Sequence, residues 1–290
     1  MAVFDNTALA NTIDEKWDMD VDDARYANAV VMPRVMNKSA LVEKSGSKIN
    51  MSYRSKYTVG DVTAATGAFT PQQITPTEVE IDIDQWKQVA IQTLDKAKAQ
   101  TFWDPESDFP KDAGAALAEE YDTQLLDLIS GFTTNIVNSD ADSPTIFDEV
   151  PMLAAMLKLA DLNIPKDSLS WFLPPVAFYG GIARKPDFVN ANRAGLPKSI
   201  LITNYRFKLL DVPAYETTLC ANAGTANISK VAGLVHKSAL AIAMQRNNTI
   251  KRAEGTSAGK LSYIVVMHSL FGKKRFREDH GVKVHVKAAL

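Results

Sequence analysis

The sequence predicts an α+β fold, on the strength of three patterns. Residues 36–76 alternate between apolar and polar side chains for about forty positions, as a long pair of β-strands does. Residues 111–134 place apolar side chains three and four positions apart, the spacing of an amphipathic helix. The second half mixes short helical patterns with short strand patterns. A long strand region and a long helix in separate stretches, followed by a half that contains both kinds of pattern, are typical of α+β proteins.

Length and composition limit the classes of protein that remain. With 290 residues, 46% of them hydrophobic, the chain can bury a core as one large or two smaller domains. Its longest apolar runs, 239–244 and 261–267, are much shorter than the roughly 20 residues of a membrane span. The first residues lack the pattern of a signal peptide. Cys220 is the single cysteine, which excludes an internal disulfide and fits a reducing cytoplasm.

Charge is distributed unequally between the two ends. Residues 1–23 hold seven acidic side chains and one basic one, a net charge of −6. Residues 250–290 hold nine basic and three acidic ones, a net charge of +6. The common interpretation is two solvated charged faces. A second interpretation is an acidic arm that lies on a basic patch of a neighbouring copy, an interaction that salt would weaken.

We expect the first helix and the first strand pair of the chain to need contact with a partner in order to be stable. Ile13, Trp17 and Val21 have helical spacing, which predicts a short amphipathic helix that is ordered only against a partner. In the strand region that follows, Ile49, Met51 and Tyr53 share one side. An isolated hairpin is marginally stable unless a sheet, helix or subunit covers it. We therefore expect other copies of the chain to cover this apolar side.

The middle of the chain predicts a strand and a long helix. Residues 78–83 alternate strictly, as a strand with one charged face does. Residues 86–94 fit either a turn or two of helix or an irregular strand. A helix that starts at Asp108 or Lys111 and ends near 134 would be about 36 Å long and would act as a structural spine.

The second half predicts a compact α/β arrangement. Its expected helices are 146–162, 176–184 and 231–246, and the last is apolar on nearly all sides and should be central. Its expected strands are 169–173, 199–210, the buried 261–267 and an edge strand at 281–287.

Each candidate motif for catalysis or for cofactor binding lacks a residue or a spacing that the motif requires. The four histidines lack the spacing of a zinc-protease helix, and the acidic run 18–29 lacks the glycine and the final glutamate of a calcium loop. Residues 255–260 are one residue too short for a phosphate loop. Cys220 fits a small buried hydrophobe. We predict no enzyme activity, no cofactor and no metal. The basic run 273–277 holds a single aromatic residue, so we expect at most weak, non-specific contact with DNA.

Several segments, in this order and spacing, resemble the major capsid (coat) proteins of tailed bacteriophages. They are Ile13 and Trp17; Gly46-Ser47-Lys48-Ile49-Asn50-Met51; Val79-Glu80-Ile81-Asp82; Ala116-Leu117-Ala118; Ser170-Trp171-Phe172-Leu173-Pro174-Pro175; 234–241; and Phe271-Gly272 with the basic run. Together they cover nearly the whole chain.

The resemblance implies a capsid fold in four parts. These are an N-terminal arm (1–34), an extended β-hairpin loop (35–78), a peripheral domain with the spine helix (79–143 and 267–290) and an axial α/β domain (144–266). It implies a structural protein that self-assembles into pentamers and hexamers of an icosahedral shell around phage DNA. The protein would be part of the virion and would assemble in the cytoplasm of the bacterial host.

The resemblance also implies partners. A separate scaffolding protein and a portal are expected, and no membrane is. Candidate contacts between subunits are Trp17, Asp18, Asp20, Asp22, Ile49, Met51, Tyr53, Lys273, Lys274, Arg275 and Arg277. A bacterial nanocompartment shell protein of the same fold is the alternative, and a soluble hydrolase of unrecognised type is the alternative from another class.

Overall fold

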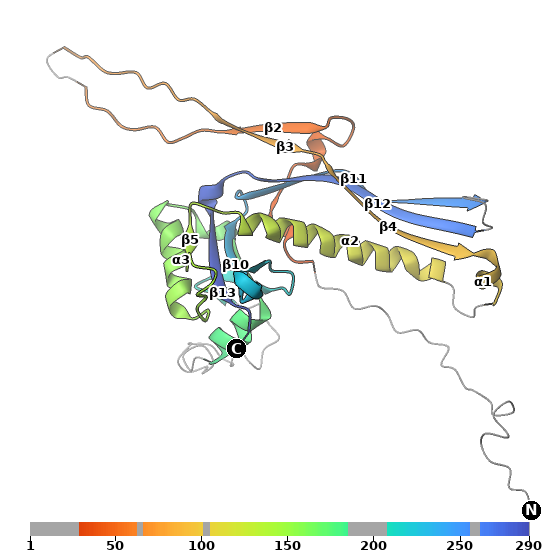
Figure 1. Cartoon of the computed structure of the whole chain (residues 1–290). Coiled ribbons are helices and arrows are strands. Elements are labelled where there is room, and N and C mark those ends of the chain that lie inside the picture. Colours follow the sequence, from red (N-terminus) through yellow and green to blue (C-terminus); the bar gives the residue numbers. More distant parts are fainter. Residues whose placement is uncertain (1–28, 63–65, 101–104, 185–207, 256–261, 290) are drawn as a thin grey trace, which may run out of the picture.

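A computed structural model describes residues 29–62, 66–100, 105–184, 208–255 and 262–289 (Figure 1). The expected N-terminal helix, with Trp17, Asp18, Asp20 and Asp22, lies outside these residues, as does the 199–207 part of an expected strand.

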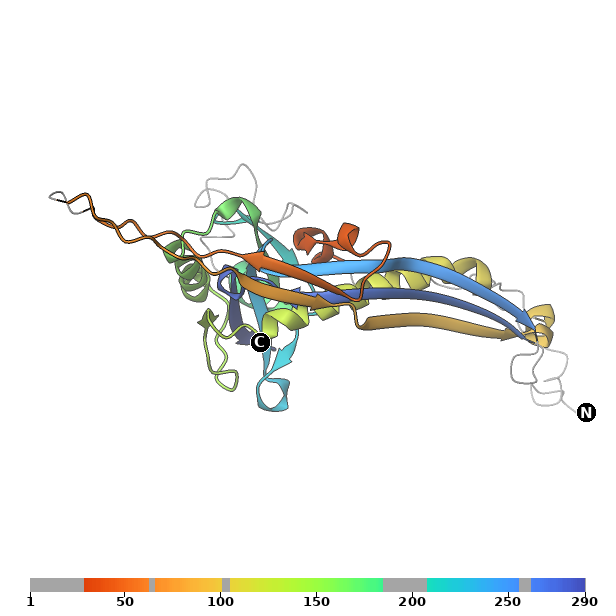
Figure 2. The ribbon, with the colours of Figure 1, turned by 90° about the horizontal axis from the view of Figure 1, so that it is seen from above.

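One long sheet and the spine helix form an elongated body (Figures 1 and 2). The strand order is β1 (Met36–Asn37), β11 (Leu240–Gly255), β12 (Ser262–Arg275) and β4 (Gln85–Leu94). β4 pairs with β12 over ten residues, so the segment that fitted either helix or strand is a strand. After the short helix α1 (Asp95–Gln100), the spine helix α2 (Pro105–Ser130) runs along the sheet. At 1.5 Å per residue it is about 39 Å long, which confirms the predicted spine.

A second sheet lies at one end of this body and packs against α3 (Glu149–Asp161) (Figure 1). Its strands, in order, are β5 (Ile136–Val137), β13 (Gly281–Lys287), β10 (Ser229–His236), β6 (Leu169–Leu173), β8 (Val212–Glu216) and β7 (Lys208–Leu209), and β9 (Asn222–Ala223) pairs with β10. Short helical turns occupy Met32–Arg34, Ser39–Leu41, Lys166–Ser168, Ala177–Gly181, Ile182–Arg184, Thr225–Asn227 and Glu278–His280. The predictions of α3, of β6 and of a helical segment near 176–184 are confirmed.

The prediction of a helix over 231–246 is wrong. Its residues form β10, a turn and the first part of β11. Alternate side chains of β10 enter two different cores: Val231 and Val235 pack with α2, and Ala232 and Leu234 pack with α3. A strand that is buried on both faces is apolar at every position, so it resembles a buried helix in the sequence.

The prediction that 281–287 is an edge strand is also wrong. β13 lies between β10 and β5, inside the second sheet. Val282, Val284 and Val286 enter the core with α3, as their alternation predicts. The polar positions between them also lie under cover, since Lys283 reaches the end of α2 and His285 is buried. The polar residues at these positions therefore do not mark an open edge, and Lys283 has a specific partner at the end of α2.

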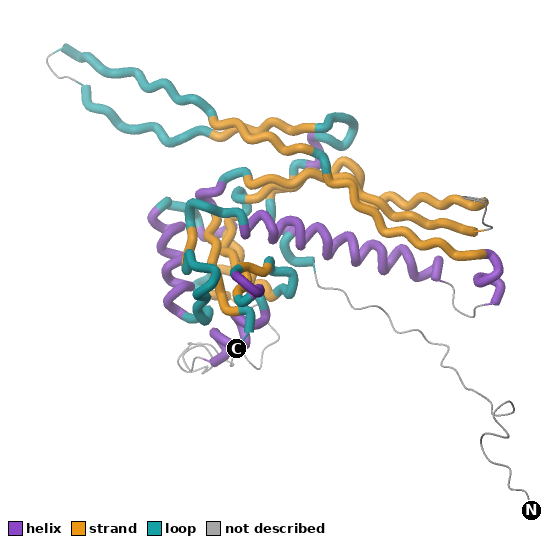
Figure 3. The backbone as a smooth tube through the Cα atoms, in the orientation of Figure 1, coloured by secondary structure: helices purple, strands orange, loops and turns teal. Residues whose placement is uncertain are grey.

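A third sheet consists of β2 (Lys48–Tyr53) and β3 (Thr77–Asp82), an antiparallel hairpin that extends away from the body (Figures 2 and 3). Its register pairs Lys48 with Asp82 and Tyr53 with Thr77. Beyond Tyr53 the described residues of the two arms form no further named strand and continue mainly as loop (Figure 3).

Two strands pair with strands from a different part of the expected division, which itself stays a prediction. β11 falls in the expected axial range 144–266 but pairs with β12 in the long sheet, next to α2. β13 falls in the expected peripheral range 267–290 but pairs with β10 in the second sheet. The chain thus passes from the long sheet to the second sheet, back to the long sheet in β11 and β12, and again to the second sheet in β13. Among the described residues, no helix is both long and apolar enough to cross a membrane.

Candidate assembly surfaces

The hairpin tip, residues 54–62 and 66–76, exposes large apolar side chains. Val59 is 99% exposed, Phe69 70% and Tyr57 69%. Two hydrogen bonds tie its arms together: the Thr58 N–H donates to Gln72 Oε1 (3.1 Å), and Gln72 Nε2 donates to the Thr58 carbonyl (2.9 Å). Exposed apolar groups on a projecting hairpin are typical of a surface that a partner covers.

The base of the hairpin, in contrast, is covered by its own chain. Ile49 and Met51 are buried with Ile81, and they pack on Ala241 and Ala243 of β11. The expectation that this apolar side lacks cover within the chain is therefore wrong at the base. The physical reason is that β11 is apolar on both faces, so one face remains available for the hairpin after α2 has covered the other.

Tyr53, the last residue of β2, is partly exposed and contacts the body. Its ring meets the Phe276 ring edge-on at 5.5 Å, and the Arg277 guanidinium lies 4.6 Å from its centroid. Two candidate residues for contacts between subunits, Tyr53 and Arg277, thus contact each other within one chain.

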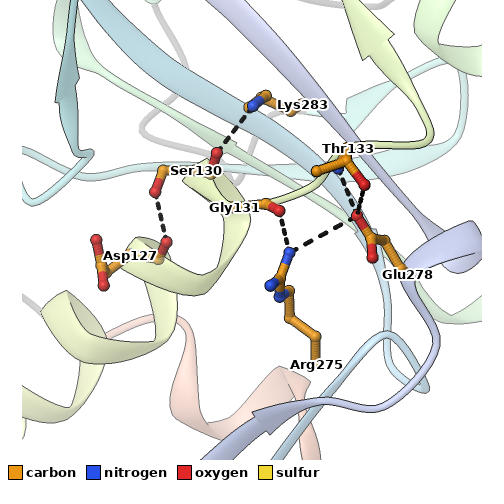
Figure 4. A network of polar contacts seen from close by, with 7 residues as sticks. All are labelled: Asp127, Ser130, Gly131, Thr133, Arg275, Glu278 and Lys283. Carbon is orange, nitrogen blue, oxygen red and sulfur yellow. Dashed lines mark hydrogen bonds and ion pairs between the residues drawn. The ribbon is translucent and has the colours of Figure 1, made fainter.

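Two residues of the basic run, Lys273 and Arg275, are bound at the carboxyl end of α2. Lys273 Nζ donates to the Gln124 carbonyl (3.0 Å) and lies 3.7 Å from Asp127. Arg275 donates to the Gly131 carbonyl, as Figure 4 shows.

Two further residues complete this network. Lys283 of β13 donates to the Ser130 carbonyl (2.8 Å; Figure 4). Glu278 accepts hydrogen bonds from the backbone and hydroxyl of Thr133 and lies 3.6 Å from Arg275. Burial and the nearby Arg275 charge lower the pKa of Lys283. Burial raises the pKa of Glu278, but the Thr133 hydrogen bonds and Arg275 outweigh it, so the net pKa is lowered.

This network assigns a structural role to the positive charge. The last turn of α2 contains no basic residue of its own, and its final carbonyls lack partners within the helix. Lys283 of β13 supplies a partner to the Ser130 carbonyl, and Arg275 of β12 supplies one to the Gly131 carbonyl directly after the helix, both at the negative end of the helix dipole. Of the four basic candidate residues, Lys274 is the one that remains exposed.

An exposed face of α3 was not among the sequence candidates. Val150 is 69% exposed, Leu157 61% and Leu153 52%. Leu153 and Leu157 line a shallow groove of about 460 Å³ together with Leu210. The sequence does contain an indication of this exposed face, because α3 has apolar side chains around more than one side of the helix.

The described residues offer little for catalysis. No group of three or more metal-binding side chains comes together within them. Cys220 is buried, and burial raises the pKa of its thiol to about 12, so the nucleophilic thiolate is suppressed.

Comparisons with known proteins bear on the fold. No family model matches the chain, and no curated protein matches it. A solved structure of Mycobacterium phage Che8 matches with a TM-score of 0.77 at 20% identity, covering 94% of this chain and 96% of that one. The capsid of cyanophage P-SCSP1u matches with a TM-score of 0.77 at 12% identity, covering 97% and 95%. The capsid of an empty GTA particle matches with a TM-score of 0.70 at 11% identity, covering 99% and 100%.

These structures are similar to the chain over nearly its whole length, and over nearly the whole length of each of them. The α+β capsid fold that the sequence predicted is thereby confirmed. At the level of the fold, this chain is similar to the capsid proteins of tailed bacteriophages.

Proposed function

We propose that the chain is a major capsid protein, a structural subunit that self-assembles into an icosahedral shell around phage DNA. The observation that carries this proposal is the hairpin tip, whose apolar side chains extend away from the body and are uncovered in the single chain. A tip of this kind is stabilised when a neighbouring subunit buries it. The fold that the chain shares with phage capsids supports the same conclusion.

The geometry suits repeated contacts between copies. The tip points away from the far end of the long sheet, so one molecule presents surfaces at opposite ends (Figure 2). The exposed face of α3 adds an apolar surface near the second sheet. We propose that contacts of this kind build pentamers and hexamers, with assembly in the host cytoplasm. A separate scaffolding protein and a portal stay predictions.

Electron microscopy of the purified, overexpressed protein tests the proposal. Wild-type protein should form closed shells. A triple variant in the tip, Tyr57→Ser, Val59→Ser and Phe69→Ser, should keep the unfolding midpoint of the wild type but lose most of the particles. Gln73→Ser, an exposed polar change in the same tip, is the matched control and should assemble normally.

Three outcomes would count against the proposal. A wild-type protein that sediments as a folded monomer, with and without a scaffolding protein, would favour the hydrolase alternative. Native particles that enclose a cargo enzyme in place of DNA would favour the nanocompartment alternative. An unchanged particle yield from the triple variant would show that the apolar side chains of the tip are not needed for assembly.

A further inference from the structure

A continuous relay of hydrogen bonds connects two histidines through a serine, at the place where β10 turns into β11. His236 Nδ1 lies 2.7 Å from the Ser238 hydroxyl, and that hydroxyl lies 2.6 Å from His280 Nδ1. On its other side, His280 Nε2 lies 3.1 Å from Arg277 Nη1. The two rings meet edge-on, with centroids 5.5 Å apart.

The positions of the protons in this relay follow from its two ends. Arginine can only donate, so His280 Nε2 must accept from Arg277 and its proton must be on Nδ1. The Ser238 hydroxyl then accepts from His280 and donates to His236 Nδ1. The Ser238 backbone N–H also donates to this Nδ1 (3.2 Å), which independently requires that it carry no proton. Every group is satisfied only when both histidines are neutral.

The relay ends at the base of the hairpin. Arg277, held by His280, lies against the ring of Tyr53. Tyr53 is the last paired residue of β2, and the unpaired arms of the tip begin directly after it. The contact between Arg277 and Tyr53 is therefore at the point from which the tip would swing.

We propose that this relay is an acid-sensitive latch on the hairpin. While His236 and His280 are neutral, it holds Arg277 against Tyr53; when His280 takes up a proton, Nε2 can no longer accept from Arg277, and the guanidinium leaves. The base of the hairpin is then less firmly attached. The latch belongs to the single chain and does not depend on the proposed shell.

The charged groups around the latch favour this response. Asp279 lies 3.7 Å from His280 Nε2, so a protonated His280 has an acceptor ready to replace its contact with Arg277. Within the described residues, His236 from β10 and Arg277 also lie beside His280, and Tyr53 faces Arg277 from β2. Burial is the main cause that lowers the pKa of both histidines, so the latch is closed at neutral pH and opens in acid.

Hydrogen exchange of the full-length protein, in a matched assembly state, tests the latch. Exchange of the amides in 48–53 and 77–82 is compared at pH 7.5 and 5.5 after correction for intrinsic rates. We expect exchange to be roughly tenfold faster at pH 5.5, which corresponds to a loss of about 1.4 kcal/mol in the attachment of the hairpin base. In His280→Gln, the side chain can donate to Ser238 and accept from Arg277 without gaining charge, so the acid response should disappear.

Two further variants keep the test decisive. His285→Gln changes another buried histidine that has no contact with Arg277, and it should keep the acid response. Arg277→Gln removes the cation, so exchange at pH 7.5 should already reach the acid level. The proposal is overturned if the wild type shows no acceleration in acid, or if either His280→Gln or Arg277→Gln retains it.

Discussion

The carboxylate of Asp122, in the middle of the spine helix, accepts a hydrogen bond from the backbone N–H of Val31 at 2.9 Å. It also accepts from the N–H groups of Met32 (2.9 Å) and Val30, and it is fully buried. These amides precede or begin the short turn Met32–Arg34, where a helical turn leaves its N–H groups without internal partners. One carboxylate therefore attaches the start of the described chain to α2.

Removal of that carboxylate should be costly. Asp122→Ala leaves three amides unpaired, two of them bonded to a charged acceptor at normal length, so we expect a loss of about 3 kcal/mol in the free energy of unfolding. Urea denaturation measures it. Asp127→Ala, on an exposed carboxylate of the same helix, is the matched control and should cost less than about 1 kcal/mol. Equal losses in the two variants would contradict this role for Asp122.

Two glycines should respond in opposite directions to the same substitution. A Cβ at Gly272 would lie 2.2 Å from the Asp82 carbonyl oxygen, a backbone atom of the hairpin base, so Gly272→Ala should cost about 3 kcal/mol. A Cβ at Gly114, inside α2, would meet nothing within 4 Å. Gly114→Ala should therefore stabilise the protein by about 0.5–1 kcal/mol, because alanine loses less backbone entropy in a helix. Thermal unfolding of both variants checks the signs.

Stability should fall in mild acid. Burial is the main cause that lowers the pKa values of His236, His280 and His285 in the folded protein, and His285 Nδ1 also lacks a partner. In the unfolded chain, the histidines take up protons near the ordinary histidine pKa of 6.5. In the folded chain, they take up protons only at lower pH. The stabilisation is thus complete above pH 6.5 and decreases as the pH falls below it.

Urea midpoints at several values between pH 8 and 5 measure this slope. These values lie above the ordinary pKa of carboxylates, so histidine protonation dominates the change. His285→Gln should flatten the curve. A midpoint that stays constant or rises below pH 6.5 would show that the folded histidines accept protons as readily as the unfolded ones.

Cys220 should be inert in the native protein. It is buried and its thiol pKa is raised to about 12, so an aromatic disulfide reagent at pH 8 should react with it only through unfolding. In urea the same thiol should react at the rate of a free cysteine. Rapid labelling of the native protein would contradict the burial.

Local patterns in the sequence were sufficient for part of this architecture. β3 and α2 each have one face toward water and one toward a core, so their periods of two and of 3.6 residues are visible in the sequence. The same holds for the apolar side of β2, although its cover was assigned to another copy. The resemblance to capsid proteins was based on the order of these elements along the chain.

The sequence alone determined that the chain has a projecting hairpin, a spine helix and a mixed second half. In these elements one side faces water and the other faces a core, so the alternation of polar and apolar residues is visible in the sequence. Only the tertiary structure decided that 231–246 forms parts of two strands, that β13 is internal and that Lys273 and Arg275 of the basic run bind at the end of α2. In each of these places, distant segments cover both faces or pair with a charge, so the residue pattern records a partner that is not adjacent in the sequence.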